Sequence, residues 1–183
     1  FPEMPIEIKT MEDNTTIEIS WASGIQRIPY FDASLYPALP ELSGITASVN
    51  IPADALAKGI GHTIYATADD VLRPVMNGIF FDMSNEGTSL VASDSHKLVC
   101  LTHSDICSED KCSFILPKKP AAILRNMLPK SDDIVRVTFD GKNAYFEFEG
   151  NILIGRLVDG SYPAYNTVIP KNNPNKLYIN RLD

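Results

Sequence analysis

The sequence predicts an α+β fold in which two helices pack on one side of antiparallel β-sheet. Apolar residues alternate with polar ones in many short runs, which is the pattern of strands that bury one face. Residues that favour turns separate these runs at short intervals. Two longer segments of helical character each follow a proline, and runs of the strand type come after both. This order favours helices and antiparallel strands that share one core.

The first part of the chain contains strand patterns followed by a linker. Apolar and polar residues alternate over 6–9, over 16–21 and over part of 24–30. The segment 31–44 is rich in proline and small residues, so it is predicted to be a linker.

The first helix is predicted over about 53–66, after a strand at 47–51. Pro52 lies between them and suits the first helical position, where a missing N–H costs nothing. Gly59 and Gly61 each weaken this helix by ~1 kcal/mol relative to alanine. Tertiary packing therefore has to stabilise the helix.

The second helix is predicted near 120–128, with Leu124, Met127 and Leu128 on one face. The residues of 84–87 have the chemistry of a hairpin turn. Further strands are predicted over 78–83, 88–93, 97–102, 114–116, 134–139, 144–148 and 152–158.

Basic residues cluster in one segment of an acidic chain. The chain has 16 basic and 23 acidic residues and a formal charge of −7, which by itself argues against a nucleic-acid partner. The segment 117–130 has no acid, and its basic residues are Lys118, Lys119, Arg125 and Lys130. The first two lie in the first turn of the helix, where the dipole disfavours cations. We therefore infer a positive surface for a phosphate backbone, with a solvated helix face as the alternative.

A cluster of possible zinc ligands supports a different function. Five possible ligands lie within seventeen residues: His96, Cys100, His103, Cys107 and Cys112. Their spacing is close to that of a zinc site, in which the ligands come in two pairs of near neighbours. The alternative function is therefore a small zinc-dependent hydrolase. The opposing interpretation, which we prefer, is that Cys100 is a small buried hydrophobe on a strand and the others lie in a surface loop. It predicts no metal and no cofactor.

No catalytic residue is predicted. The run 93–96, Ser-Asp-Ser-His, contains the residue types of a nucleophilic triad, but consecutive residues of a strand point to opposite faces. The sequence has no Gly-x-Ser-x-Gly elbow and no glycine-rich phosphate loop. A binding function is therefore favoured over an enzyme.

We expect a cytoplasmic protein. The apolar run 79–81 is far shorter than the ~18 residues of a spanning helix, and the first residues do not form a secretory signal. The odd number of cysteines fits a reducing compartment, and both observations disfavour a β-rich adhesion module. The chain begins with Phe1 and not with Met, which indicates an excised piece.

Three segments resemble the bacterial β sliding clamp family, the processivity subunit of DNA polymerase III. Residues 72–79, Leu-Arg-Pro-Val-Met-Asn-Gly-Ile, are similar to the segment after the first helix of that family's middle domain. Residues 90–98 resemble its Ala-Thr-Asp-Gly-His-Arg-Leu signature. Residues 155–165, followed by Val-Ile-Pro at 168–170, match its Leu-(Val/Ile)-Asp-Gly-x-(Phe/Tyr)-Pro-x-Tyr run. The three segments occur in the family's order.

The resemblance implies a fragment of a three-domain chain with a DNA-clamp fold. Residues 1–46 would be the last strands of domain 1 and a linker, 47–170 the complete domain 2, and 171–183 the start of a truncated domain 3. Members of the family form head-to-tail homodimeric rings that encircle double-stranded DNA without reading its sequence. Their helices line the central hole. Lys118 and Lys119 match positions that face the duplex, while Arg125, Lys130 and Lys58 are added from charge alone.

The resemblance also implies a peptide-binding pocket. In the family, short linear motifs of the polymerase III alpha subunit, the clamp loader and repair polymerases bind there, and no membrane or catalysis is involved. The middle-domain wall would comprise Arg73, Met76, Ser93, Ser95, His96, Lys97, Leu98, Pro163, Thr167 and Val168. Met76, Leu98, Pro163 and Val168 would supply an adaptable apolar surface for a peptide anchor.

Four positions depart from the family pattern. Ser93 replaces threonine, Ser95 replaces glycine and Lys97 replaces arginine, while Thr167 stands where some relatives have a basic residue. A positive φ at Ser95 would be strained if the glycine is needed for its conformation. His96 is expected at the rim of the pocket, with an ordinary sheet histidine as the alternative.

Overall fold

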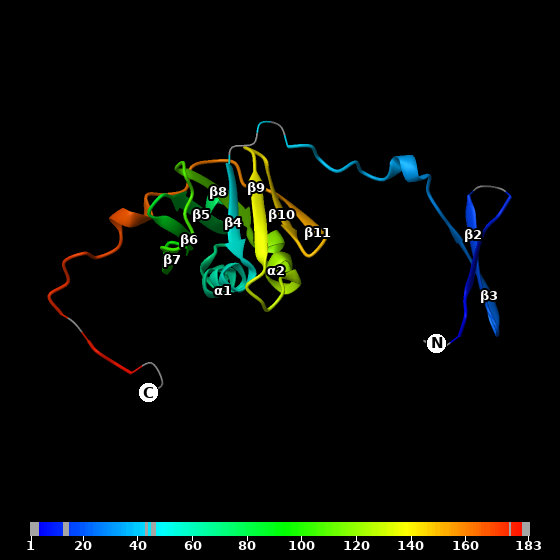
Figure 1. Cartoon of the computed structure of the whole chain (residues 1–183), viewed down its shortest axis with the longest axis horizontal. Coiled ribbons are helices and arrows are strands. Elements are labelled where there is room, and N and C mark those ends of the chain that lie inside the picture. The colour runs from blue at the N-terminus through cyan, green and yellow to red at the C-terminus, as the bar shows by residue number, and fades with distance from the viewer. Residues whose placement is uncertain (1–3, 13–14, 43, 45–46, 176, 181–183) are drawn as a thin grey trace. The chain divides into compact units, whose positions relative to one another are not determined.

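Figure 1 shows the computed structural model of the chain, which describes residues 4–12, 15–42, 44, 47–175 and 177–180. The chain divides into two compact units, Phe1–Glu41 and Leu42–Asp183. No helix of the described residues is long and apolar enough to cross a membrane.

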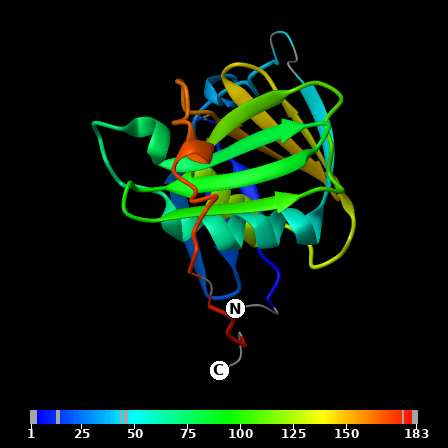
Figure 2. The same cartoon turned by 90° about the vertical axis from the view of Figure 1, so that its left-hand side faces the viewer.

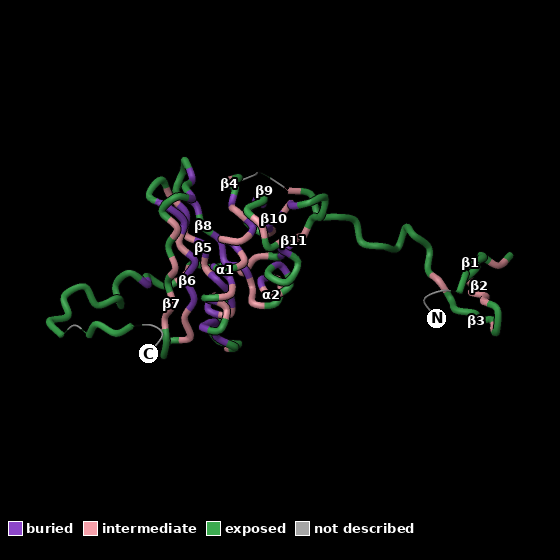
Figure 3. The backbone as a smooth tube through the Cα atoms, turned by 60° about the horizontal axis from the view of Figure 1, so that its bottom comes forward, coloured by how far each residue is buried: buried purple, intermediate pink, exposed green. Residues whose placement is uncertain are grey.

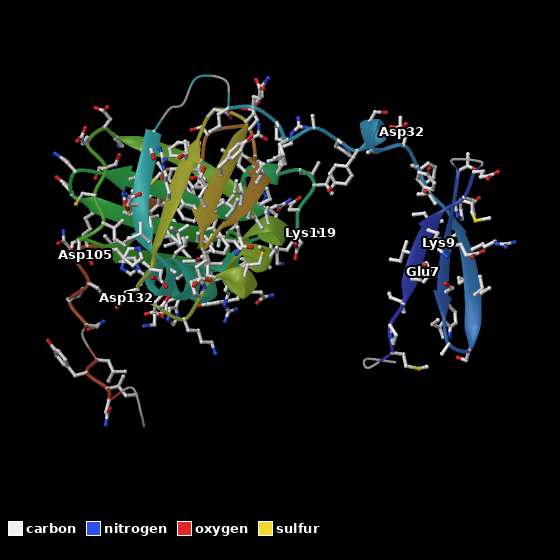
Figure 4. The ribbon with its side chains drawn as sticks, turned by 45° about the vertical axis from the view of Figure 1, so that its right-hand side comes forward. Glu7, Lys9, Asp32, Asp105, Lys119 and Asp132 are labelled. Carbon is white, nitrogen blue, oxygen red and sulfur yellow. The ribbon has the colours of Figure 1, made fainter. Side chains whose placement is uncertain are left out.

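The first unit is a three-stranded antiparallel sheet. Its strands β1 (Glu7–Thr10), β2 (Thr16–Trp21) and β3 (Gly24–Pro29) follow the predicted alternation, with β2 in the centre. Most residues of this sheet are exposed or half-buried, as the colours of Figure 3 show. Glu7 and Lys9 form an ion pair of 2.9 Å on the edge strand β1 (Figure 4). The sheet therefore has little core of its own.

The predicted linker contains one short helical turn. Residues Ala33–Leu35 form the 3-10 helix η1, and the Asp32 carboxylate caps it by accepting the N–H of Ser34 at 2.8 Å. The other described residues of 31–44 belong to no helix or strand.

The second unit contains two four-stranded antiparallel sheets and two helices. The first sheet has the order β11-β10-β9-β4, and the second has the order β7-β6-β5-β8. The strands of the first are β4 (Ala47–Pro52), β9 (Ile134–Phe139), β10 (Asn143–Phe148) and β11 (Asn151–Arg156). Those of the second are β5 (Gly78–Ser84), β6 (Gly87–Ser93), β7 (Leu98–His103) and β8 (Cys112–Pro117).

The two helices lie next to each other on one side of this unit. Helix α1 (Ala53–Thr63) packs against β4, β6 and β7, and α2 (Lys118–Met127) packs against β5 and β8. Figure 1 shows both below the strands, and Figure 2 shows α1 running beneath the strands of the second sheet. The predicted α+β fold is confirmed, with the sheet divided in two.

One hydrophobic core joins both sheets and both helices. Phe81 of β5 stacks on Phe114 of β8 with ring centroids 4.5 Å apart, and Phe114 reaches Phe139 of β9 at 4.7 Å. Leu56 and Leu124 enter the same core from α1 and α2. The contact between Phe114 and Phe139 therefore connects the two sheets directly.

The glycines of α1 allow close packing. A Cβ atom at Gly59 would lie 3.0 Å from Leu90 Cδ2, and one at Gly61 would lie 3.1 Å from Arg125 Nε. The cost of glycine in this helix is thus offset by the approach of β6 on one side and of α2 on the other.

Helix α1 begins at Ala53, as predicted, but differs from the prediction elsewhere. Pro52 is the last residue of β4 and not the first residue of the helix. The helix ends at Thr63, whose hydroxyl donates to the Gly59 carbonyl at 2.8 Å, and a 3-10 turn η2 (Ile64–Ala66) follows.

Helix α2 also differs from its prediction. It begins at Lys118, because the backbone N–H of Lys118 donates to the Asn77 carbonyl at 3.0 Å and so is satisfied from another segment. Leu124 and Leu128 are buried as predicted, but Met127 is 43% exposed.

Candidate functional site

A cavity of about 590 Å³ brings three distant segments together. It contains nine of the ten residues predicted for a peptide pocket, and Thr167 is not in its lining. Three further residues, Tyr162, Ala164 and Tyr165, complete its wall. The full lining is Arg73, Met76, Ser93, Ser95, His96, Lys97, Leu98, Tyr162, Pro163, Ala164, Tyr165 and Val168.

The first segment is a short helical turn before β5. Arg73 precedes the 3-10 helix η3 (Pro74–Met76), and the N–H of Met76 donates to the Arg73 carbonyl at 3.0 Å. The Asp70 carboxylate accepts from Arg73 Nε at 2.8 Å, and this hydrogen bond lowers the pKa of Asp70. The turn thereby fixes the side chains of Arg73 and Met76 at the cavity.

The second segment is the turn between β6 and β7. Asp94 Oδ1 accepts the backbone N–H groups of His96 at 3.0 Å and Lys97 at 2.9 Å. The Lys97 ammonium also pairs with Asp94. These contacts hold the pKa of Asp94 well below its usual range, and the hydrogen bond from the Lys97 ammonium has the largest effect. The ionised carboxylate therefore organises this turn at neutral pH.

Ser95 adopts a positive φ of 78° within that turn. The positive φ that we expected to be strained for a serine at this position is therefore present. The Ser95 hydroxyl accepts a hydrogen bond from Arg73 Nη1 and lies 3.8 Å from Met76 Sδ. His96 is exposed in the same turn and is not part of a strand.

The third segment carries an aromatic wall that the sequence did not reveal as part of the site. Tyr162 stacks on Phe80 of β5 with centroids 4.7 Å apart and planes 2° from parallel. The Tyr165 hydroxyl donates to Asp82 Oδ2 at 2.9 Å from the 3-10 helix η4 (Tyr165–Thr167). Burial raises the pKa of both tyrosines to about 12. Both rings therefore stay neutral and anchor the segment to the sheet.

The cavity can hold an apolar side chain beside polar donors. Val168 is 67% exposed, and Leu98 is half-buried at the start of β7. Arg73 supplies a cation at the same cavity. An exposed apolar surface with a few polar groups is characteristic of a binding site for peptides or small molecules.

A second cavity, of about 610 Å³, lies between the two helices and contains three of the five predicted DNA-facing residues. Lys58 comes from α1, Arg125 from α2 and Lys130 from the loop after α2. We call this cavity the basic groove. Its complete lining is Asp54, Ala57, Lys58, Gly61, His62, Arg125, Asn126, Leu128, Pro129 and Lys130.

Acidic side chains reduce the positive charge near the basic groove. Lys58 pairs with Asp54 at 2.5 Å, and this hydrogen bond raises the pKa of Lys58, with a smaller effect from Asp132. The position of Asp132 can be followed in Figure 4, which also labels Lys119 of α2. Lys118 lies outside the groove lining and pairs with Asp69 at 2.6 Å. Within the described part of the chain, Lys119, Arg125 and Lys130 form no ion pair.

The possible zinc ligands do not form a site among the described residues, where no three His, Cys, Asp or Glu side chains gather to hold a metal ion. Cys100 and Cys107 are exposed and Cys112 is buried. The expectation that Cys100 is the buried cysteine was therefore wrong, because its side chain points to the outer face of β7, while Cys112 packs in the core. The zinc hydrolase has no support from this geometry.

Comparison with known proteins gives a consistent result. The family described as the DNA polymerase III beta subunit, central domain, matches residues 50–164. The beta sliding clamp of Bacillus subtilis is 25% identical over 180 residues, which cover 98% of this chain and 47% of that protein. The beta sliding clamp of Staphylococcus epidermidis is 30% identical over 184 residues, covering 100% of this chain and 48% of that protein.

Solved structures of such proteins share the fold. A sliding clamp from Bacillus subtilis superposes with a TM-score of 0.81 at 24% identity, covering 93% of this chain and 46% of that one. A beta subunit from Thermotoga maritima gives a TM-score of 0.74 at 25% identity, covering 91% of this chain and 44% of that one. The chain spans about half the length of the curated relatives it matches.

Proposed function

This chain belongs to the DNA polymerase III beta subunit family, and from that premise we propose that it is part of a sliding clamp that tethers a polymerase to DNA. Residues 1–46 would close a first domain, 47–170 form the middle domain and 171–183 begin a third. The complete protein would be a head-to-tail homodimeric ring around duplex DNA. Its role would be binding and not catalysis, in the cytoplasm.

The peptide pocket carries this proposal. Nine residues chosen from three separate motifs line one cavity, although the first and the last of them, Arg73 and Val168, lie ninety-five positions apart in the sequence. Met76, Leu98 and Val168 provide an apolar surface, and Arg73 and His96 provide polar groups at the same place. The partners would be short linear motifs of the polymerase alpha subunit, the clamp loader and repair polymerases.

A peptide titration tests the pocket. We expect a short synthetic peptide of the pattern Gln-x-x-Leu-Phe to shift the amide NMR signals of Met76, His96, Leu98 and Val168 in the labelled chain. Binding should be weak, because every residue that lines the cavity in this chain comes from the proposed middle domain. The control peptide has alanine in place of both Leu and Phe and should produce no shifts. Shifts scattered over the surface, or identical with the control peptide, would contradict the pocket.

The basic groove supports the DNA part of the proposal. Arg125 and Lys130 lie in a groove between two helices, and phosphate contacts of this kind position a duplex without reading its sequence. The acidic neighbours Asp54 and Asp132 keep the attraction weak. Encirclement by a ring would make tight binding unnecessary, so weak contacts are compatible with sliding.

Neutralising the groove should weaken the response of DNA binding to salt. With both Arg125→Gln and Lys130→Gln, the slope of log K against log salt for a short duplex should fall by about 2, since each phosphate contact contributes ~0.9. Binding would be followed by NMR at low ionic strength. The matched control is Lys142→Gln, which removes one positive charge from the exposed β9–β10 turn. An equal change of slope per charge in the control would refute a specific role of the groove.

A further inference from the structure

A hydrogen-bonded link joins two walls of the peptide pocket. Arg73 precedes η3, and its Nη1 donates to the hydroxyl of Ser95 in the β6–β7 turn, twenty-two positions later. The same guanidinium donates through Nε to Asp70 Oδ2 at 2.8 Å. The Arg73 side chain is therefore held from two sides, by a carboxylate on its own loop and by a hydroxyl on the facing turn.

The backbone at Ser95 is unfavourable for most residues that have a side chain, serine included. Its φ of 78° lies in the left-handed region, which glycine adopts without strain. The surrounding turn enforces this conformation: Asp94 accepts two backbone N–H groups, and Ser93 Oγ accepts the N–H of Ser95 at 3.2 Å. Glycine would satisfy the backbone equally well. What the serine adds at this position is its hydroxyl, and that hydroxyl is bonded to Arg73.

The held guanidinium retains donors for a ligand. Arginine has five N–H donors, and the hydrogen bonds of Arg73 to Asp70 and Ser95 engage one Nε and one Nη1 group. The Arg73 side chain is 49% exposed and lines the cavity together with Ser95 and the apolar Met76. A peptide whose apolar side chain occupies the cavity would thus meet a cationic donor in a fixed orientation.

We propose that Ser95 is a positioning residue that holds Arg73 at the mouth of the pocket, so that its free N–H groups bind an acceptor oxygen of the peptide. The acceptor would be a main-chain carbonyl or a side-chain amide or carboxylate next to the apolar anchor. This role rests on the proposed peptide-binding function and deepens it. Fixing the donor in advance removes part of the ordering cost that a free arginine side chain would incur on binding.

Two substitutions at Ser95 separate the hydroxyl from the backbone. Ser95→Ala removes the hydroxyl and keeps the strained Cβ, whereas Ser95→Gly removes both. We expect both variants to bind the Gln-x-x-Leu-Phe peptide roughly five- to tenfold more weakly than the unchanged chain in NMR titrations. Their thermal midpoints should differ, with the glycine variant the more stable, because glycine relieves the positive φ. If both variants lose the same affinity for the peptide although their stabilities differ, the missing hydroxyl is the cause of the loss.

A double-mutant cycle shows whether Ser95 acts through Arg73. In an Arg73→Ala background, Ser95→Ala should cause no further loss of affinity, because the group it positions is gone. The signals of the Arg73 guanidinium nitrogens provide a readout without peptide. Rotation about the bond to Nη1 should be slowed in the unchanged chain and faster in Ser95→Ala.

The outcomes distinguish this inference from the function on which it rests. If the unchanged chain binds the peptide and Ser95→Ala binds it equally well, the positioning role is wrong and the pocket stands. Additive losses in the cycle, or Arg73 signals that are the same with and without the Ser95 hydroxyl, would also overturn the role. If the unchanged chain does not bind the peptide at all, the proposed function fails, and the positioning role fails with it.

Discussion

Replacing Leu98 by glutamate is expected to weaken binding of a Gln-x-x-Leu-Phe peptide by about 30- to 150-fold. Leu98 lines the pocket at the start of β7, opposite Ser93 of β6. A carboxylate there would lose water when the apolar side chain of the peptide enters, and the two cations of the pocket are already paired, Arg73 with Asp70 and Lys97 with Asp94. The cost is about 2–3 kcal/mol, which corresponds to that loss of affinity.

The fold should survive this change, because Leu98 is only half-buried and outside the main core. The matched control is Ile152→Glu, which makes the same kind of change at a residue of β11 that is 56% exposed and outside the pocket. Fluorescence anisotropy of a labelled peptide would give both affinities, and amide spectra would verify the fold. Affinity retained in Leu98→Glu, or lost equally in Ile152→Glu, would argue against the pocket.

Replacing Phe81 by alanine is expected to destabilise the second unit by about 3–5 kcal/mol. The Phe81 side chain is fully buried and stacks on Phe114, which in turn contacts the other sheet through Phe139. Truncation of Phe81 would remove its stacking on Phe114 and leave a cavity in the core. Since a domain of this size is stable by only about 5–15 kcal/mol, this loss would be a large part of its total stability.

The measurement should be chemical denaturation followed by far-UV circular dichroism. Tryptophan fluorescence is unsuitable, because the single tryptophan, Trp21, lies in β2 of the first unit. The control is Phe31→Ala, which removes the same side chain where it is 83% exposed, and it should change stability by less than about 0.5 kcal/mol. Equal effects of the two substitutions would mean that the buried ring of Phe81 does not stabilise the second unit.

Local patterns predicted most of the elements, because alternation and turn residues act over a few positions. The strands β2 and β9 have the predicted limits. The start of α2 could not be predicted, since the N–H of Lys118 is satisfied by Asn77, forty-one positions earlier. The division into two sheets has the same origin. It depends on which strands pair, and β4 pairs with β9 across more than eighty residues.

The candidate site was predictable only in part, and through motif resemblance more than through physics. Tyr162 and Tyr165 were missed because an aromatic residue after the last strand is equally consistent with core packing. Thr167 is absent from the lining, and its hydroxyl donates to the Ala164 carbonyl at 2.7 Å within η4. The pairing of Lys118 with Asp69, which weakens its case as a DNA contact, joins residues forty-nine positions apart.

The aromatic wall makes the pocket depend on a latch of two rings. Tyr162 stacks on Phe80, and Tyr165, the one buried residue of 161–170, bonds to Asp82 through its hydroxyl. If both rings leave their places, the segment can detach while the sheets remain folded, and the cavity loses one side. A ligand would then bind only the latched fraction of molecules, so its apparent dissociation constant would rise as that fraction falls. A bound ligand would in turn stabilise the latched state and slow amide hydrogen exchange in residues 161–170. The order of this short segment would therefore depend on whether a partner is bound.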